Sequence, residues 1–379
     1  MRDLKIAIVH DYLNQMGGAE RVVAVLHKMF PEAPIYTTIV DRNKLLPELQ
    51  DAVIHTTWMQ RIPGILNKFK LYFWLYPLSI RSINVKSYDL ILSSSSAYAK
   101  GVRKGRQSLH VCYCYTPMRF VWDFDTYMES IQVPRLVKRI AKWLIYPLKR
   151  WDKNNSEHVD RLIAISTIVK ERIKQCYGVN APIIFPPVEV SRFSVKEGEP
   201  EDYFLVVSRL VSYKKIDLAI EACTQSGKRL IVIGDGPDRQ RLEQLAGDTI
   251  TFLGRKSDED VVRYMQNCKA LIFPGIEDFG LTPLEANACG RPIIAYYGGG
   301  ALDTIIAEQT GLYFEEQSIN SLVNTINRFD QYDWDPQYIR QHAEQFSEHI
   351  FIERMQSIIE SSLKSREINS TIPEPEGSY

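Results

Sequence analysis

The chain has 379 residues, too many for one ordinary hydrophobic core, so its length favours two domains. Hydrophobic residues make up 45% of it and charged residues 24%, which is typical of a soluble globular protein. The formal net charge is +0, so overall charge gives no reason to expect nucleic-acid binding. The first apolar run, residues 6–9, is too short for a signal-peptide core, and no apolar run is long enough to span a bilayer.

In the first half of the chain, strand and helix patterns alternate from residue 6 to about residue 188. Gly17 and Gly18 follow the first strand and open a helix. Glycines let the backbone approach a ligand closely, and a helix N-terminus offers free N–H groups suited to phosphate. A tight turn between strand and helix is the alternative interpretation of this pair.

The six cysteines are spread along the chain, and only Cys112 and Cys114 lie close together in sequence. Residues two positions apart on a strand point to the same face, which is a poor arrangement for a zinc site. We therefore expect six reduced, mostly buried thiols of a cytoplasmic protein.

Two prolines at 186–187 and a polar stretch at 194–202 predict a linker between two domains. Beyond the linker, a second alternation predicts a parallel sheet with helices on both faces. The predicted strands of this half lie at 204–208, 230–233, 250–254, 270–273 and 292–296. A last amphipathic helix is predicted to end near residue 364.

Two loops of the second half carry charges suited to a nucleotide ligand. Arg209 follows the strand at 204–208, and Lys214 lies shortly after it. Two cations after a strand can neutralise a pyrophosphate, although a solvated basic loop is the alternative. The chain lacks a Walker motif, and it lacks the glycine spacing of a dinucleotide fold after the first strand.

Glu277 and Glu285 bracket the turn between the strand at 270–273 and the next helix. Thr282 is the predicted N-cap and Pro283 the predicted first helical residue, so Glu285 fits the second half of a capping box. Open α/β sheets bind ligands at the carboxyl ends of their strands, and this gives the two glutamates a second interpretation as ligand-binding residues.

Four motifs in this order make the chain resemble a retaining nucleotide-sugar glycosyltransferase of family 4, with the GT-B fold. The resemblance spans residues 5 to about 364 and is closest to the mannosyltransferase-like branch of bacterial surface-polysaccharide synthesis. The motifs are Gly17-Gly18-Ala19-Glu20, Ser208-Arg209-Leu210 with Lys214, Gly234-Asp235-Gly236-Pro237 with Phe252-Leu253-Gly254, and the pair Glu277 and Glu285.

The resemblance implies an α/β chain of two Rossmann-like, doubly wound parallel-sheet domains facing a central cleft. Residues 1–190 would form the acceptor-binding domain and 191–345 the nucleotide-sugar-binding domain. Residues 346–364 would form a helix that crosses back onto the N-terminal domain, and 365–379 a disordered tail.

The resemblance also implies residue roles. Arg209 and Lys214 would hold the donor diphosphate and Glu277 the transferred sugar, and these three would carry catalysis without a metal or other cofactor. Glu285 would bind the ribose, the N–H groups of 278–281 would support the sugar, and Gly17 and Gly18 would meet the diphosphate or the acceptor. The implied substrate-binding residues are Gly17, Gly18, Tyr115, Ser166, Gly234, Arg255, Lys256, Asp278, Phe279, Gly280, Leu281 and Glu285.

The implied reaction moves a hexose, by preference mannose from GDP-mannose, to a lipid-linked glycan with retention of configuration. A phosphorylase or epimerase on the same fold is one alternative. Tyr115 stands where many relatives have a histidine, which leaves the donor sugar open. It also leaves open a packed aromatic, or a degenerate chain that is a non-catalytic partner in a polysaccharide assembly complex. The presence of Arg209, Lys214, Glu277 and Glu285 favours an enzyme.

Two basic, aromatic-bearing segments, 65–76 and 135–153, have the character of surfaces that bind anionic membranes. Ordinary core helices with a solvated basic face are the alternative. Together with a lipid-linked acceptor, the segments predict a cytoplasmic protein that lies peripherally on the inner face of the plasma membrane. The basic residues of the second segment are Arg135, Lys138, Arg139, Lys142, Lys149, Arg150 and Lys153.

Overall fold

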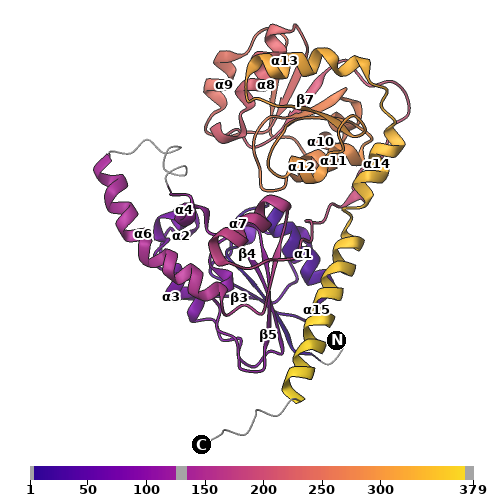
Figure 1. Ribbon diagram of the computed structural model, residues 1–379. Coiled ribbons are helices and arrows are strands. Elements are labelled where there is room, and N and C mark those ends of the chain that lie inside the picture. Colours follow the sequence, from indigo (N-terminus) through magenta and orange to yellow (C-terminus); the bar gives the residue numbers. More distant parts are fainter. Residues whose placement is uncertain (1–3, 125–134, 372–379) are drawn as a thin grey trace, which may run out of the picture. The chain divides into compact units, whose positions relative to one another are not determined.

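The computed structural model describes residues 4–124 and 135–371, and the chain divides into two compact units. Unit 1 comprises the residues up to Ile184 together with those from Phe351 onward, and unit 2 is Phe185–Ile350 (Figure 1). Each unit contains a six-stranded sheet in which all strand pairs are parallel. The predicted α/β class with two parallel sheets is therefore confirmed.

The sheet of unit 1 has the order β3-β2-β1-β4-β5-β6. Its strands are β1 (Ile6–His10), β2 (Ile35–Thr37), β3 (Ile54–Thr56), β4 (Leu90–Ser95), β5 (Leu109–Cys114) and β6 (Arg161–Ala164). Its helices are α1 (Gly18–Met29), α2 (Ile65–Lys68), α3 (Tyr76–Arg81), α4 (Arg119–Trp122), α6 (Arg135–Ser156) and α7 (Thr167–Tyr177). The strands β1, β4 and β5 are buried along their whole length, including the polar residues His10, Ser93–Ser95 and His110.

Helix α15 (Glu348–Thr371) packs on unit 1 from Phe351 onward. The Phe351 ring meets Tyr113 of β5 edge to face at 5.4 Å, and Arg161 Nε donates a 3.3 Å hydrogen bond to the Ser362 hydroxyl. The helix continues beyond the predicted end at 364, because the sequence offers no glycine or proline before Pro373. Residues 365–371 of the predicted tail are thus helical, and 372–379 lie outside the described residues.

The sheet of unit 2 has the order β12-β11-β10-β7-β8-β9. Its strands are β7 (Phe204–Val207), β8 (Leu230–Ile233), β9 (Ile250–Gly254), β10 (Ala270–Phe273), β11 (Ile293–Tyr296) and β12 (Gly311–Phe314). Its helices are α8 (Ile216–Gln225), α9 (Arg239–Leu245), α10 (Asp258–Asn267), α11 (Leu281–Ala288), α12 (Ala301–Thr304), α13 (Ile319–Arg328) and α14 (Pro336–Glu344). Apolar residues of the central strands and of α8 and α13 form its core. The five strands predicted for this half agree with β7 to β11 to within one residue at each end, and β12 was not predicted.

Among the described helices of both units, none is long and apolar enough to cross a bilayer.

Candidate functional site

The two sheets share one strand order and therefore one kind of crevice. In unit 1, β1 lies between β2 and β4, and in unit 2, β7 lies between β8 and β10. Successive strands extend outward in opposite directions from the pairs β1–β4 and β7–β10, so the loops that follow these strands diverge and leave a crevice at the carboxyl ends. Residues after β1 and β4, and after β7 and β10, are thus placed to form ligand sites.

In unit 2, the crevice brings Lys214 and Glu277 together. Lys214 ends the short 3-10 helix η7 (Ser212–Lys214) after β7, and Glu277 stands in the loop after β10. Their ammonium and carboxylate groups form an ion pair, and the side chains are 16% and 21% exposed. A Cβ atom on Gly275 would lie only 2.8 Å from the Lys214 carbonyl oxygen, so the two loops also meet through their backbones. Two of the three predicted catalytic residues are therefore direct neighbours.

Gly234 lets the loop after β8 pass against the loop after β7. Its φ is +133°, and a Cβ atom at this position would lie 1.9 Å from the Ser208 carbonyl oxygen. The Gly234 N–H donates to the Gly254 carbonyl at 2.9 Å, and the Leu210 N–H donates to the Asp235 carbonyl at 3.0 Å. Backbone contacts that only glycine permits thus hold the loops after β7, β8 and β9 together.

Three predicted cationic residues of unit 2 reach solvent. Arg209 is exposed directly after Ser208, and Arg255 and Lys256 are exposed after β9. Within residues 4–124 and 135–371, no ion pair engages the Arg209 guanidinium, whereas Lys214 is compensated by Glu277. Arg209 therefore brings an uncompensated positive charge to this edge of the sheet.

Residues 274–280 form the loop between β10 and α11, and α11 begins at a different residue from the one predicted. Gly280, with φ +90°, is the N-cap in place of Thr282, and because it has no side chain it makes no side-chain cap hydrogen bond. A Cβ atom on Gly280 would lie 2.7 Å from the Phe273 ring, so only glycine can turn here. Pro283 then occupies the third helical position, and Glu285 lies beyond it, so the predicted capping box is wrong.

The loop before α11 is anchored by an aromatic side chain. Phe279 is 4% exposed, and its ring stacks on Phe185 with the centroids 5.6 Å apart. Asp278 and Leu281, on either side of this anchor, remain partly exposed, as does Glu285 in α11. The predicted sugar- and ribose-binding residues thus lie along one loop and one helix, but Phe279 contributes its side chain to the core.

The crevice of unit 1 contains a buried polar cluster. His10 ends β1, and its Nδ1 lies 3.0 Å from both the carbonyl and the hydroxyl oxygen of Ser94. Glu20 of α1 accepts a 2.9 Å hydrogen bond from the Gly17 N–H, and its Oε1 lies 4.0 Å from His10 Nε2. Burial alone would lower the pKa of His10, but the Glu20 carboxylate and the neighbouring Asp11 outweigh burial and raise it.

Tyr115 joins this cluster from the end of β5. Its hydroxyl lies 2.8 Å from the Ser94 hydroxyl and donates a 3.0 Å hydrogen bond to the Ala19 carbonyl. Burial raises its pKa, so the phenol is neutral at pH 7. These contacts match the packed-aromatic interpretation, because the hydroxyl is already bonded to the first turn of α1.

Sequence reasoning missed Asp11, the carboxylate that shapes this crevice. Asp11 is 1% exposed and accepts hydrogen bonds of 2.6 to 2.9 Å from the Ser96 hydroxyl and from four backbone N–H groups. The available signal was a polar His-Asp pair directly after a buried strand. The N–H donors belong to Ser96, Ala97, Tyr98 and Ala99.

Three predicted residues of unit 1 occupy helix N-termini. Ser166 is fully buried, and its hydroxyl caps α7 by accepting a 3.3 Å hydrogen bond from the Val169 N–H. Gly18 is the exposed first residue of α1, and Gly17 is its N-cap. The Ser166 side chain therefore serves the helix, whereas the backbone at Gly18 is open to solvent.

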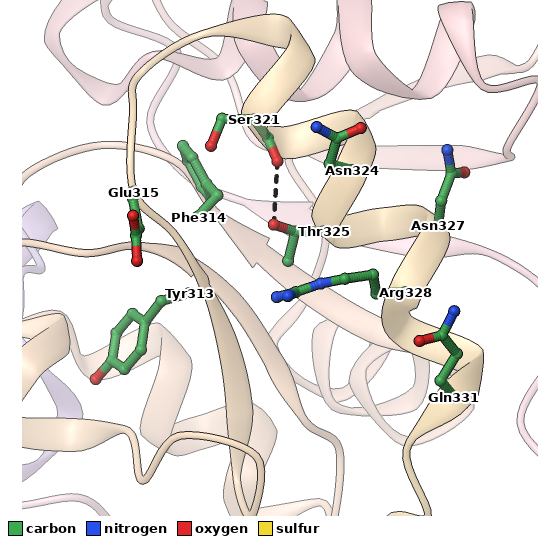
Figure 2. A pocket seen from close by; sticks show the side chains of 9 residues that line it. All are labelled: Tyr313, Phe314, Glu315, Ser321, Asn324, Thr325, Asn327, Arg328 and Gln331. Carbon is green, nitrogen blue, oxygen red and sulfur yellow. Dashed lines mark hydrogen bonds between the residues drawn. The ribbon is translucent and has the colours of Figure 1, made fainter.

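A surface groove of about 610 Å³ lies elsewhere in unit 2, between β12 and α13 (Figure 2). The Thr325 hydroxyl donates a 3.0 Å hydrogen bond to the Ser321 carbonyl along its wall. The lining residues are Tyr313, Phe314, Glu315, Ser321, Asn324, Thr325, Asn327, Arg328 and Gln331. No predicted site residue is among them, so this groove is separate from the crevice between β7 and β10.

The cysteines are free thiols, and five of the six are buried. Burial raises the pKa of Cys112 and of Cys176 to about 11, which keeps both protonated at pH 7. Over the described part of the chain, no three His, Cys, Asp or Glu side chains are grouped so as to hold a metal ion.

Two parallel sheets of this strand order, with glycine-lined and cation-bearing loops at a switch point, define a two-domain α/β protein of the GT-B class. The model of glycosyltransferase family 4 matches residues 16–192, and that of glycosyl transferases group 1 matches residues 188–346. The chain is a family 4-like glycosyltransferase.

Known proteins of this kind resemble it at low identity. An uncharacterized glycosyltransferase of Methanocaldococcus jannaschii is 29% identical over 44% of this chain and 48% of its own length. The alpha-1,3/1,6-mannosyltransferase of Dictyostelium discoideum is 23% identical over 86% of this chain and 90% of its own length. A GDP-mannose-dependent phosphatidylinositol monomannoside mannosyltransferase of Corynebacterium glutamicum is 28% identical over 48% and 55%. Anabaena HepE in complex with UDP superposes with a TM-score of 0.71 at 16% identity, covering 94% of this chain and 100% of that one.

Proposed function

We propose that the chain is a retaining hexosyltransferase that moves mannose from a nucleotide sugar to a lipid-linked glycan in bacterial polysaccharide or glycolipid synthesis. The observation that carries the proposal is the ion pair between Lys214 and Glu277 at the crevice between β7 and β10 of unit 2. Open α/β sheets bind their ligands in such crevices. The exposed Arg209 adds a second cation after the same strand.

Each group has a role in the proposed reaction. Arg209 and Lys214 neutralise the charge that develops on the departing diphosphate, which is the main contribution that a preorganised site makes to such a step. Glu277 accepts hydrogen bonds from the hydroxyls of the sugar, and its pairing with Lys214 keeps both groups in place before the donor arrives. Glu285 binds the ribose. The two cations supply the positive charge without a metal.

The proposed substitution takes place on one face of the sugar. The bond between the anomeric carbon and the diphosphate oxygen breaks, and a bond to the acceptor oxygen forms on the same side. The acceptor proton passes to an oxygen of the leaving phosphate. Such a route needs no protein nucleophile and leaves catalysis to positioning and charge.

GDP-mannose is the proposed donor. The Dictyostelium relative is a mannosyltransferase, and the Corynebacterium relative is GDP-mannose-dependent. The Anabaena structure contains UDP, so a UDP-hexose is the alternative donor that an experiment must separate. A lipid-linked acceptor places the reaction on the inner face of the plasma membrane, where the chain would lie peripherally.

A thermal-shift panel tests the donor assignment. Wild type is heated with GDP, UDP and ADP and with their hexose conjugates, and the same panel is run on Glu285→Gln and Lys214→Met. Glu221→Gln is a matched control, because Glu221 is also a partly exposed helical glutamate of unit 2. A ligand at a hundredfold excess over its dissociation constant stabilises the folded state by about 2.7 kcal/mol.

The proposal predicts a shift with GDP and GDP-mannose that both site variants lose and the control keeps. A shift with UDP compounds alone would change the donor. No shift with any nucleotide would favour the degenerate, non-catalytic partner instead. Retention is tested separately, by the anomeric coupling of the transferred sugar in the product, and an inverted anomer would refute that part.

A further inference from the structure

We propose that unit 1 binds an anionic membrane through a docking face built from two segments distant in sequence. The first segment comprises α2, the 3-10 helix η4 (Phe69–Tyr72) and α3, and the second is α6. The docking face is defined by the exposed residues Leu71, Trp74, Leu78 and Tyr146 with the cations Lys68, Lys70, Arg81, Arg139, Lys142 and Arg150. The biological role of this docking face rests on the lipid-linked acceptor of the proposed function, but membrane binding can be tested without catalysis.

The first segment exposes an apolar stripe. Leu71 of η4, Trp74 of the turn that follows and Leu78 of α3 are 68%, 61% and 59% exposed. Tyr76 and Ile80 point the other way, into the core of unit 1. Because the core already has its own stripe, the exposed one has no packing role within the unit. Contiguous exposed apolar side chains of this size mark interaction surfaces.

The second segment repeats the pattern with more charge. Ile145 and Leu148 are buried, whereas Tyr146 is 62% exposed on the opposite side of α6. The Arg150 guanidinium lies over the Tyr146 ring at 6.0 Å from its centroid, and Arg139 and Lys142 are exposed about two turns and one turn before Tyr146. The side chains of Arg135, Lys138, Trp143 and Leu144 in the same stretch lie outside the described ones.

Both segments pack on one core (Figure 1). Tyr98 lies between them, because its ring stacks on Tyr76 at 4.6 Å and meets Trp151 of α6 at 6.0 Å. Its hydroxyl also donates a 2.9 Å hydrogen bond to the Phe73 carbonyl. The sequence predicted two basic segments, and the fold packs both of them on a single buried cluster.

Within the described residues of the two segments, no exposed side chain carries a negative charge. The sequence contains no aspartate or glutamate from residue 52 to 88, and Asp152 is the single acid between residues 135 and 153. Asp152 is fully buried, where its carboxylate pairs with the Lys100 ammonium group at 2.6 Å. It also accepts hydrogen bonds from Trp122 Nε1 at 2.7 Å and from the Tyr177 hydroxyl at 2.6 Å. Its charge is compensated inside the protein and does not offset the cations outside.

Charge decides which occupant fits. Lysine and arginine around exposed tryptophan and leucine match the headgroup and acyl boundary of an anionic bilayer. A symmetric second copy would place the same cationic patch on both sides of the contact, and like charges would then meet. An anionic membrane satisfies both the apolar stripe and the cations.

Vesicle co-sedimentation tests the docking face on the full chain without donor or acceptor. Vesicles of phosphatidylcholine alone are compared with vesicles that also contain phosphatidylglycerol. Trp74→Ser with Leu78→Ser should weaken binding to the anionic vesicles about tenfold or more, because buried apolar side chains contribute that much. Lys70→Gln and Arg150→Gln should each weaken it about fivefold.

Matched controls come from exposed residues of unit 1 outside the two segments. Val53 is 61% exposed, so Val53→Ser removes a comparable apolar side chain, and Arg42→Gln removes an exposed cation of η1 (Arg42–Lys44). Both controls should bind like wild type, and circular dichroism should show that all variants are folded.

Three outcomes would overturn the proposal. In the first, wild type does not bind anionic vesicles. In the second, it binds neutral and anionic vesicles equally. In the third, docking-face and control variants lose the same amount of vesicle binding. A wild-type dimer in solution that Trp74→Ser dissociates, with no vesicle binding, would assign the face to a second copy. The vesicle assay does not depend on nucleotide binding. A failure to bind nucleotide would therefore leave the docking face supported, and a failure to bind vesicles would leave the proposed donor site supported.

Discussion

Replacing Gly234 by alanine tests whether close contact between the loops after β7 and β8 is needed for donor binding. The new Cβ atom would lie 1.9 Å from the Ser208 carbonyl oxygen, so one of the two backbones must move by about 1 Å to reach a tolerated distance. The φ of +133° is a region that only glycine populates, at a cost of about 1–3 kcal/mol for another residue. The exposed Arg209 follows Ser208 and would move with it.

The movement also weakens two backbone hydrogen bonds, from the Ser208 N–H to the Ile233 carbonyl at 3.0 Å and from the Gly234 N–H to the Gly254 carbonyl at 2.9 Å. Each contributes about 0.5–1.5 kcal/mol. With the φ strain, Gly234→Ala should destabilise unit 2 by roughly 3 kcal/mol. Gly227→Ala is the matched control, because its φ is +63° and no atom lies within 4 Å of the new Cβ, which leaves only about 1–2 kcal/mol of strain.

Urea unfolding followed by far-ultraviolet circular dichroism measures the stability difference, and calorimetric titration with GDP and UDP sugars measures donor binding. Gly234→Ala should lose both stability and affinity, whereas Gly227→Ala should lose some stability alone. If the two variants lose equal stability and both keep wild-type affinity, the loop contact does not position Arg209 and the reasoning is wrong.

Three further predictions concern charged groups. Lys214→Met should weaken nucleotide-sugar binding about tenfold or more in calorimetric titration, because a charge-assisted hydrogen bond contributes about 1.5–3 kcal/mol. Lys215→Met, which replaces the exposed neighbouring lysine, should change the affinity little. Equal losses of affinity in the two variants would contradict this prediction. Lys100→Met leaves the buried Asp152 carboxylate without its cation and should destabilise unit 1 by about 3–5 kcal/mol in urea unfolding, and a loss below about 1 kcal/mol would contradict the pairing. Burial lowers the pKa of His110 to about 3, with the nearby Lys104 acting in the same direction. Below pH 6.5 the unfolded chain therefore binds a proton at His110 that the folded chain does not bind. As the pH is lowered from 6.5 toward 3, the free energy of unfolding should decrease by up to about 1.4 kcal/mol per pH unit. His110→Gln should flatten this part of the measured stability profile.

The fold could be predicted from the sequence because the central strands of its sheets are buried. Runs such as Phe204–Val207 and Ala270–Phe273 are apolar throughout and are separated by helical patterns, which predicts a parallel sheet. The pairing of Lys214 with Glu277 is a different matter. Each residue was assigned through the family resemblance, but their contact depends on the strand order, which places β7 beside β10.

Other features depend on contacts that no local pattern contains. Thr282 and Pro283 form a good N-cap signal, yet the helix begins after Gly280, where a side chain would meet the Phe273 ring. Asp152 stood as the single acid of a basic helix, and its buried cation is supplied by a distant loop. Tertiary packing overrides local propensity at each of these positions.

The two crevices differ in the side chains that lie in them, and the difference predicts which unit binds which substrate. In unit 1, the Glu20 carboxylate accepts the Gly17 N–H and places a negative charge at the start of α1. That charge opposes a phosphate at the same helix end, so the Gly17 turn suits the hydroxyls of an acceptor better than the diphosphate. In unit 2, the N-cap residue of α11 is Gly280, which has no side chain, and among the described residues no ion pair engages Arg209. We therefore expect the anionic part of the donor to bind there. Exchanging Glu20 for glutamine should therefore change acceptor kinetics and leave nucleotide affinity unchanged. A loss of nucleotide affinity in this variant would put the diphosphate at α1 instead.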